Sequence, residues 1–185
     1  TKGGQVNEGV ATFFLRDRFE LIDSHRTVLK QLIDPFAKVS LIETSECVTE
    51  FSKVDKENGN LMQTQTYPHP IMDNLESNEA KKLISNFDDL RACIFRNPKL
   101  LKRFTDRHTI LQTTLLQVKN RADTFLIIAN THLYFAPDAD HIRLLQACTC
   151  IRYLEFLKEY YKRLIKTKGF ARDRFKISIM FCGDM

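Results

Sequence analysis

Two apolar runs in the C-terminal half of the chain are joined by a long helical pattern. The runs are Thr124–Ala129 and Phe175–Cys182, and their length and composition are typical of strands buried on both faces of a sheet. Between them, apolar residues recur at helical spacing from Asp138, the predicted N-cap, to an end near Gly169. We expect one face of this helix to be buried, formed by Leu144, Cys148, Ile151, Leu154, Leu157, Tyr161 and Leu164. The order strand, helix, strand predicts a mixed α/β domain.

Shorter patterns precede this unit. Val10–Leu15 and Phe19–Ile22 are predicted to form the two strands of a hairpin, because both are rich in aromatic or β-branched residues and a charged triplet separates them. Asn78–Arg96 is predicted to be a helix that Pro98 interrupts, and residues 110 to 118 are a strand candidate. The apolar positions of the predicted helix are Leu83, Phe87, Leu90 and Ile94.

The segment from about Asp23 to Asn74 has no clear period. Its later part, residues 53 to 74, has the polarity and the prolines of a long loop, so we predict a poorly ordered excursion there. An insertion is expected in this segment.

The composition indicates a globular protein but does not indicate a function. The chain has 185 residues, of which 43% are apolar and 28% charged, which is enough for one globular domain. Its net charge of +5 and pI near 9.0 are compatible with a phosphate-bearing partner but are common in proteins that have none. No uncharged apolar run reaches the roughly 18 residues of a membrane span, so no membrane partner is expected.

The cysteines point to reduced thiols. There are five, an odd number without the spacing of a disulfide framework. Cys148 and Cys150 lie on the predicted long helix, where their side chains diverge by about 200° and cannot share one metal ion.

Polar residues follow both apolar runs. His132 comes shortly after the first run and Asp184 directly after the second. Because a strand–helix–strand unit is normally right-handed and parallel, the two should meet at the carboxyl edge of the sheet. An imidazole beside a carboxylate suits acid/base or metal chemistry. Spacing alone also allows a structural histidine and a Gly-Asp turn.

Four segments together resemble successive motifs of the endonuclease/exonuclease/phosphatase superfamily. They are Glu8–Phe14, Asn130–Pro137, Ile142–Gln146 and Phe181–Asp184. Their order and separation agree with that family. Within it the chain is most similar to the branch that holds the deadenylases, the Angel proteins and the 2′-phosphodiesterases, and the N-T-H-L-Y sequence at 130–134 points to the last of these. Residues from about 23 to 107 resemble nothing specific in that family, so a variable insertion is expected there.

The resemblance implies a two-sheet α/β sandwich with outer helices, present here as a piece truncated at both ends. It implies a phosphodiesterase or 3′-exoribonuclease that uses Mg²⁺, with Mn²⁺ as an alternative, and hydrolyses oligoadenylate or poly(A) RNA to AMP. The compartment implied is the mitochondrial matrix, with the cytoplasm as the alternative, and no obligate protein partner is inferred.

The resemblance also assigns roles to single residues. His132 matches the histidine that hydrogen-bonds the scissile phosphate, and Asp184 matches the aspartate of a G-D-x-N motif that orients and helps deprotonate the attacking water. The positions expected to bind or support the substrate are Glu8, Asn130, Tyr134 and Pro137. Tyr134 and Phe135 offer either a stacking face for a base or packing for the core.

The chain departs from the family pattern in ways that bear on activity. The principal metal-binding glutamate is expected before Thr1, so the chain itself is expected to hold no metal ligand of that kind and to be inactive alone. Ala136 and Met185 stand where the family has other residues, which concerns substrate preference.

A catalytically inactive relative that binds RNA or protein is the competing interpretation. Basic residues near the end of the predicted long helix either contact a phosphate backbone or form a solvated face. They are Lys158, Lys162, Arg163, Lys166 and Lys168.

Overall fold

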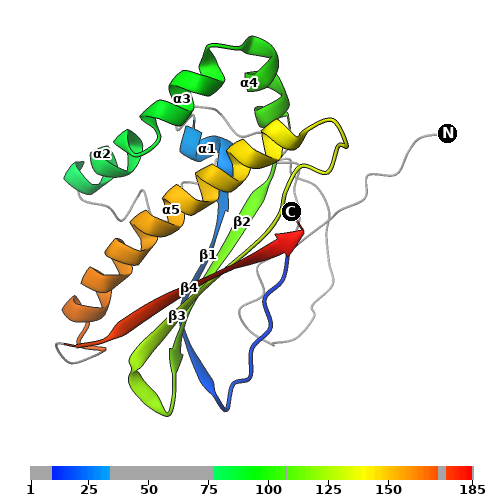
Figure 1. The fold of residues 1–185 in the computed structure, drawn as a ribbon. Helices are drawn as coiled ribbons and strands as arrows, with labels where there is room; N and C mark the ends of the chain where they lie inside the picture. Colours follow the sequence, from blue (N-terminus) through cyan, green and yellow to red (C-terminus); the bar gives the residue numbers. More distant parts are fainter. Residues whose placement is uncertain (1–9, 34–76, 107, 171–173, 185) are drawn as a thin grey trace, which may run out of the picture.

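A four-stranded mixed sheet forms the centre of the molecule (Figure 1). The computed structural model describes residues 10–33, 77–106, 108–170 and 174–184. The strands, in the order β1-β2-β3-β4 across the sheet, are β1 (Phe19–Val28), β2 (Ile110–Val118), β3 (Arg121–His132) and β4 (Lys176–Asp184). β2 runs antiparallel to β1 and β3, whereas β3 and β4 are parallel. The predicted α/β class and the parallel strand–helix–strand unit are therefore confirmed.

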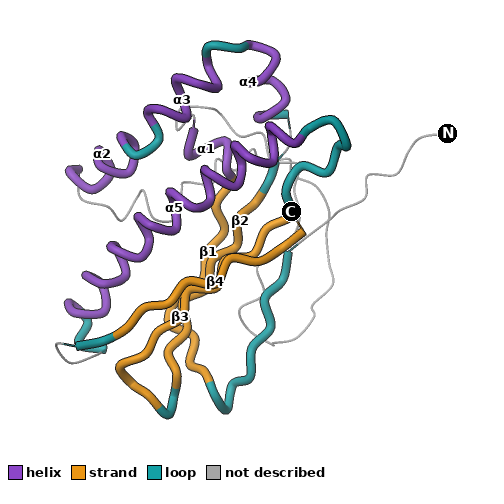
Figure 2. Tube along the Cα trace, viewed as in Figure 1, coloured by secondary structure: helices purple, strands orange, loops and turns teal. Residues whose placement is uncertain are grey.

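The helices lie on one side of the sheet, and residues 10–15 run as a loop along the other side (Figures 1 and 2). The helices are α1 (Leu29–Ile33), α2 (Ser77–Ser85), α3 (Asp88–Phe95), α4 (Pro98–Thr105) and α5 (Asp140–Thr167). Among the described residues, no helix is both long and apolar enough to cross a membrane. The described residues form one sheet, so the second sheet of the expected sandwich stays a prediction.

Alternate residues of β3 separate a covered face of the sheet from an open one. Phe125, Ile127 and Ala129 face the helices and are completely buried. Leu126 belongs to the opposite face and is only half-buried, and on the same face of the edge strand β4 the side chain of Met180 is 52% exposed. The expectation that both strands are buried on both faces is wrong for the described residues, because helices cover one face only.

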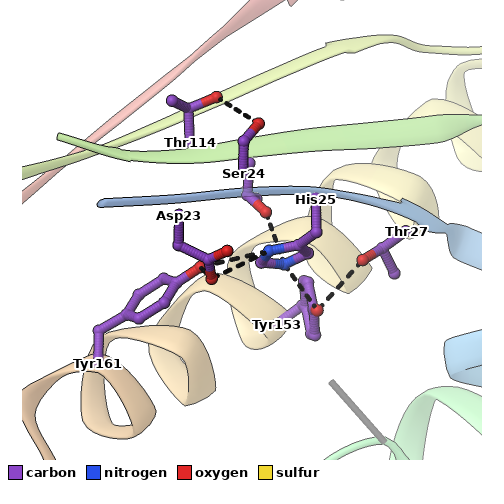
Figure 3. Close-up of polar contacts among 8 residues, drawn as sticks. Asp23, Ser24, His25, Thr27, Thr114, Tyr153 and Tyr161 are labelled. Atoms are coloured by element: carbon purple, nitrogen blue, oxygen red, sulfur yellow. Dashed lines mark hydrogen bonds and ion pairs between the residues drawn. The ribbon is translucent and has the colours of Figure 1, made fainter. Parts of the chain in front are cut away.

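A buried polar network joins β1 to α5 on the covered face (Figure 3). His25 Nε2 lies 2.7 Å from Thr113 Oγ1 and 3.2 Å from the Tyr153 hydroxyl. On the other side of the ring, Nδ1 lies 3.3 Å from the Tyr161 hydroxyl, which donates to Asp23 Oδ2 at 2.8 Å. These contacts satisfy polar groups whose burial would otherwise be costly. They also attach the first strand to a helix near the other end of the chain.

α5 buries a face that overlaps the predicted one only in part. Leu144 and Ile151 are 65% and 49% exposed, while the polar residues Gln146 and Thr149 are buried. Gln146 donates to Thr109 Oγ1 at 2.9 Å, and Thr149 donates to a carbonyl of its own helix at 2.7 Å. Buried residues that the pattern did predict are Leu154, Leu157 and Tyr161. A pattern of apolar positions misses polar residues that find internal partners.

The predicted start of α5 is also wrong, whereas its end is confirmed. Ala139 is the N-cap of the helix and makes no side-chain capping bond. The Asp138 carboxylate instead accepts two hydrogen bonds from Arg103, both at 2.9 Å. At the other end Gly169 has φ 68°, a left-handed conformation that favours glycine and ends helices.

The N-terminal half departs from the predicted pattern in three places. Val10–Leu15 is a loop rather than the first strand of a hairpin. β1 continues through Asp23 to Val28, so the strand does not stop where its period becomes unclear. The single helix predicted ahead of Pro98 is two helices, α2 and α3, and Pro98 begins α4. The excursion predicted for residues 53 to 74 lies outside the described residues.

Candidate active site

The ends of β3 and β4 bring His132 and Asp184 together. The two residues are paired in the parallel ladder, and the backbone N–H of Leu133 donates to the Asp184 carbonyl at 2.9 Å. His132 Nε2 lies 3.7 Å from Asp184 Oδ2, and the two side chains are 33% and 84% exposed. The expectation that they meet at one edge of the sheet is confirmed. Their catalytic roles stay predictions.

Gly183 is required for this junction. It has φ 141°, and a Cβ atom added to it would lie 1.8 Å from the carbonyl oxygen of Thr131. Because that oxygen is backbone of the neighbouring strand, no side chain can be accommodated without moving the strands apart. The glycine before Asp184 therefore allows β4 to approach β3 closely where the two polar side chains meet.

Asn130 lies two residues before His132, on the open face of the sheet, and forms a hydrogen bond with the N-terminal loop. Its side-chain amide donates to the carbonyl of Ala11 at 2.9 Å. Thr12 makes a second contact across the same face, donating to Gln112 Oε1 at 3.3 Å. Asn130 thus holds Ala11 beside it, while Gln112 holds Thr12. The supporting role expected of Asn130 stays a prediction. Glu8, the predicted residue near the phosphate, lies outside the described residues.

The loop between β3 and α5 carries the other predicted substrate residues. Phe135 is 64% exposed, and its ring centroid lies 6.5 Å from that of His132 and 6.1 Å from that of Tyr134. Pro137 is also exposed, two residues farther along the loop. Phe135 is thus not a core residue, and its face is accessible for stacking against a base.

Three residues outside the predicted site hold this loop, namely Arg103, Arg143 and Gln146. Gln146 accepts a hydrogen bond from the Tyr134 backbone N–H at 2.9 Å, and Arg143 donates to the carbonyl of Ala136 at 2.9 Å. The sequence offered a signal for two of them, because Arg143 and Gln146 belong to one of the four motif segments, yet no role followed from it. Nothing in the sequence pointed to Arg103.

Charge links Arg103 to the same loop. Hydrogen bonding to Asp138 raises the pKa of the arginine, and a neighbouring Tyr134 side chain acts in the same direction. The same hydrogen bond lowers the pKa of Asp138. The pair is exposed to solvent, so its contribution lies in placing the loop rather than in stabilising the fold.

A divalent metal ion does not find a complete ligand set in the described part of the chain. Among residues 10–33, 77–106, 108–170 and 174–184, no group of three or more His, Cys, Asp or Glu side chains is arranged to hold a metal. Asp184 can supply one carboxylate, whereas magnesium takes about six oxygen ligands, some of them from water and substrate.

Two proteins share partial sequence similarity with the chain, and no protein-family model matches it. Over 72 residues it is 39% identical to the probable CCR4-Not complex 3'-5'-exoribonuclease subunit Ccr4 of Enterocytozoon bieneusi, covering 36% of this chain and 15% of that protein. Over 89 residues it is 29% identical to 2',5'-phosphodiesterase 12 of Mus musculus, covering 48% of this chain and 12% of that protein.

The two similarities agree with each other in class. Both point to a relative of the endonuclease/exonuclease/phosphatase type. The matched regions span only 15% and 12% of the lengths of these relatives, so activity, substrate and partners of the whole protein are proposals.

Proposed function

We propose that the protein carrying this chain is a phosphodiesterase that hydrolyses RNA, with oligoadenylate or poly(A) as substrate and AMP as product. The observation that carries the proposal is the His132–Asp184 pair at the carboxyl ends of two neighbouring parallel strands, where α/β sheets bind ligands. The relatives support the same reaction class, since one is named as an exoribonuclease subunit and the other as a phosphodiesterase.

His132 suits contact with the scissile phosphate. Its ring is partly exposed at the sheet edge, while its backbone is fixed by the ladder to β4. An imidazole N–H held beside a phosphoryl oxygen stabilises the negative charge that grows there as phosphorus becomes five-coordinate. Because the ladder sets its position before substrate binds, little reorganisation is needed during the reaction.

Asp184 suits the attacking water. Its carboxylate is more exposed than the imidazole and can accept a proton from a water molecule. As the water oxygen bonds to phosphorus, the bond from phosphorus to the oxygen of the leaving nucleotide breaks, and that oxygen takes up a proton from solvent. With 3.7 Å between Nε2 and Oδ2, the phosphate and its attacking water can lie against both side chains.

Magnesium, with manganese as the alternative, is the proposed cofactor. When bound, it would neutralise phosphate charge and make a bound water more acidic. The described residues do not complete its ligand set, so the steps assigned to His132 and Asp184 are those of these side chains alone.

The proposal is tested by measuring AMP release from 2′,5′- and 3′,5′-linked oligoadenylate by chromatography. The full-length protein should release AMP in magnesium or manganese, and this release should stop when the metal is chelated. His132→Ala should lower kcat at least about a hundredfold, the usual scale for removing one preorganised stabilising group. His141→Ala is the matched control, because His141 is an exposed histidine in the first turn of α5.

Two results would contradict the proposal. One is a folded full-length protein without activity in either metal, and the other is a His132→Ala variant with unchanged turnover. The first would favour a catalytically inactive relative that binds RNA or protein, and the second would remove His132 from the mechanism.

A further inference from the structure

We propose that Gln146 and Arg143 are positioning residues that hold the loop at residues 133–139 in the shape that binds substrate. The inference rests on the proposed function and assigns separate roles to two parts of the fold. The β3–β4 ladder places the reacting side chains, and α5 places the substrate-binding ones.

Gln146 connects the loop to the interior. It is 1% exposed, lies in the second turn of α5, and uses both ends of its amide. Its oxygen accepts from the Tyr134 N–H at 2.9 Å, and its nitrogen donates to Thr109 Oγ1 at 2.9 Å. Thr109 in turn accepts a hydrogen bond from the Leu29 N–H through its carbonyl at 3.0 Å. The loop is thereby attached to a side chain that packing keeps in one place.

Arg143 lies one helical turn earlier and holds the carbonyl side of the same loop. Its Nη1 donates to the carbonyls of Tyr134 at 3.2 Å and Ala136 at 2.9 Å. Its other terminal nitrogen pairs with Asp140. A planar guanidinium can hold several acceptors at fixed angles, which a lysine ammonium cannot do equally well. Tyr134 is therefore fixed through both its N–H and its carbonyl by residues three positions apart on one helix.

α4 supports the loop from another direction. Arg103 makes its two-bond contact with Asp138, the residue after Pro137. α4 begins with a well-formed cap, because the Asn97 side chain accepts from the N–H groups of residues 99 and 100 and Pro98 follows it. Residues from three successive parts of the loop are thus held by side chains of two helices.

The backbone of His132 is held by β4 rather than by these contacts. His132 is the last residue of β3, paired with Asp184, and the next residue is bonded to β4 through its own N–H. Loosening the loop should therefore displace Tyr134, Phe135 and Pro137 while leaving the reacting pair in place. The expected signature is weaker substrate binding with a nearly intact chemical step.

The test uses Gln146→Met, which conserves volume and removes both hydrogen bonds, in the full-length protein. With oligoadenylate as substrate, KM should rise at least about tenfold and kcat stay within about threefold of the unsubstituted protein. Arg143→Ala should act in the same way, and Arg143→Lys should restore part of the loss. Because Arg143 is partly exposed, its variants keep the test open if Gln146→Met does not fold.

Thr149→Val is the matched control. Thr149 is also completely buried on α5, but its hydroxyl donates to the Leu145 carbonyl of the same helix and not to the loop. It should lower thermal stability without changing KM. A fall in kcat with KM unchanged in Gln146→Met or Arg143→Ala would overturn the inference, as would kinetics like those of the control.

Hydrogen exchange at the Tyr134 amide separates failure of the inference from failure of the proposed function. Exchange of this amide should be at least about tenfold faster in Gln146→Met than in Thr149→Val, since only the former removes its acceptor. If the unsubstituted protein has no activity, the proposed function fails while this measurement still decides whether Gln146 holds the loop. Unchanged exchange in Gln146→Met would overturn the inference.

Discussion

Two histidine–aspartate pairs of nearly equal spacing lie in different surroundings. His25 Nδ1 is 3.8 Å from Asp23 Oδ2 between β1 and α5, and His132 Nε2 is 3.7 Å from Asp184 Oδ2 at the ends of β3 and β4. The first histidine side chain is 5% exposed and the second 33%. Distance alone therefore does not identify a reactive pair. The two pairs differ instead in their exposure to solvent.

Hydroxyl groups surround the His25–Asp23 pair and form hydrogen bonds with it. His25 Nε2 lies 2.7 Å from the Thr113 hydroxyl oxygen and 3.2 Å from that of Tyr153, within hydrogen-bonding distance of both. Burial raises the pKa of Tyr153 and of Tyr161, so both hydroxyls keep their protons and remain donors. With each polar group bonded inside the protein, this network stabilises the attachment of β1 to α5.

The His132–Asp184 pair is more exposed to solvent. Asp184 is mostly exposed, and the loop beside His132 presents an exposed aromatic ring, Phe135. The same two side chains therefore support the fold where helices cover them and are open to solvent where the sheet ends.

The largest expected effect that separates the pairs is on stability. His25→Ala should lower the free energy of unfolding by about 3 kcal/mol, because it leaves a cavity and several buried polar groups without a partner. His132→Ala should lower it by less than about 1 kcal/mol, since its side chain lies at the edge of the sheet. Urea denaturation of both variants checks this. Equal losses would show that the two environments do not differ as described.

A smaller effect should appear in the pH dependence of stability. Burial, the largest influence on Asp23, raises its pKa, but nearby His25 and the hydrogen bond from Tyr161 outweigh it and the pKa is lowered from 3.8. A lowered pKa in the folded state means that the carboxylate stabilises the fold above pH 3.8 and that this contribution is lost as pH falls below that value.

Asp23→Asn removes the titrating group and tests that sign. Between about pH 6 and about pH 3, the unsubstituted protein should lose more unfolding free energy than Asp23→Asn does, as measured by urea denaturation. An equal or greater loss in the variant would contradict the assignment. The difference should be modest, because the Asp23 side chain is 38% exposed and solvent screens its interactions.

The sequence predicted the strand–helix–strand unit because its apolar residues are continuous or periodic. It predicted only the first part of β1, Phe19–Ile22, because the register shifts between Leu21 and Asp23. Such a shift interrupts the alternation of side chains between the two faces of a strand. Among the polar residues that follow, Thr27 and Asp23 bond to Tyr153 and Tyr161, which are distant in sequence. No local pattern contains that information.

The site was predictable in part for a similar reason. His132 and Asp184 are the last residues of two neighbouring parallel strands, so the topology of the sheet alone brings them together. The contacts of Arg103, Arg143 and Gln146 depend instead on how two helices meet a loop, and helix periodicity does not describe this. Asp138 shows the difference, since it resembles an N-cap in sequence and is an ion-pair partner in the structure.

The most direct test compares the kcat of Asp184→Asn with that of Asp23→Asn in the full-length protein. Both substitutions conserve shape and remove one carboxylate from a histidine–aspartate pair of similar spacing. AMP release from oligoadenylate, measured at a temperature where both variants are folded, should fall at least about a hundredfold in Asp184→Asn and stay within about threefold in Asp23→Asn. Unchanged turnover in Asp184→Asn, or an equal fall in both variants, would contradict the assignment of chemistry to the His132–Asp184 pair.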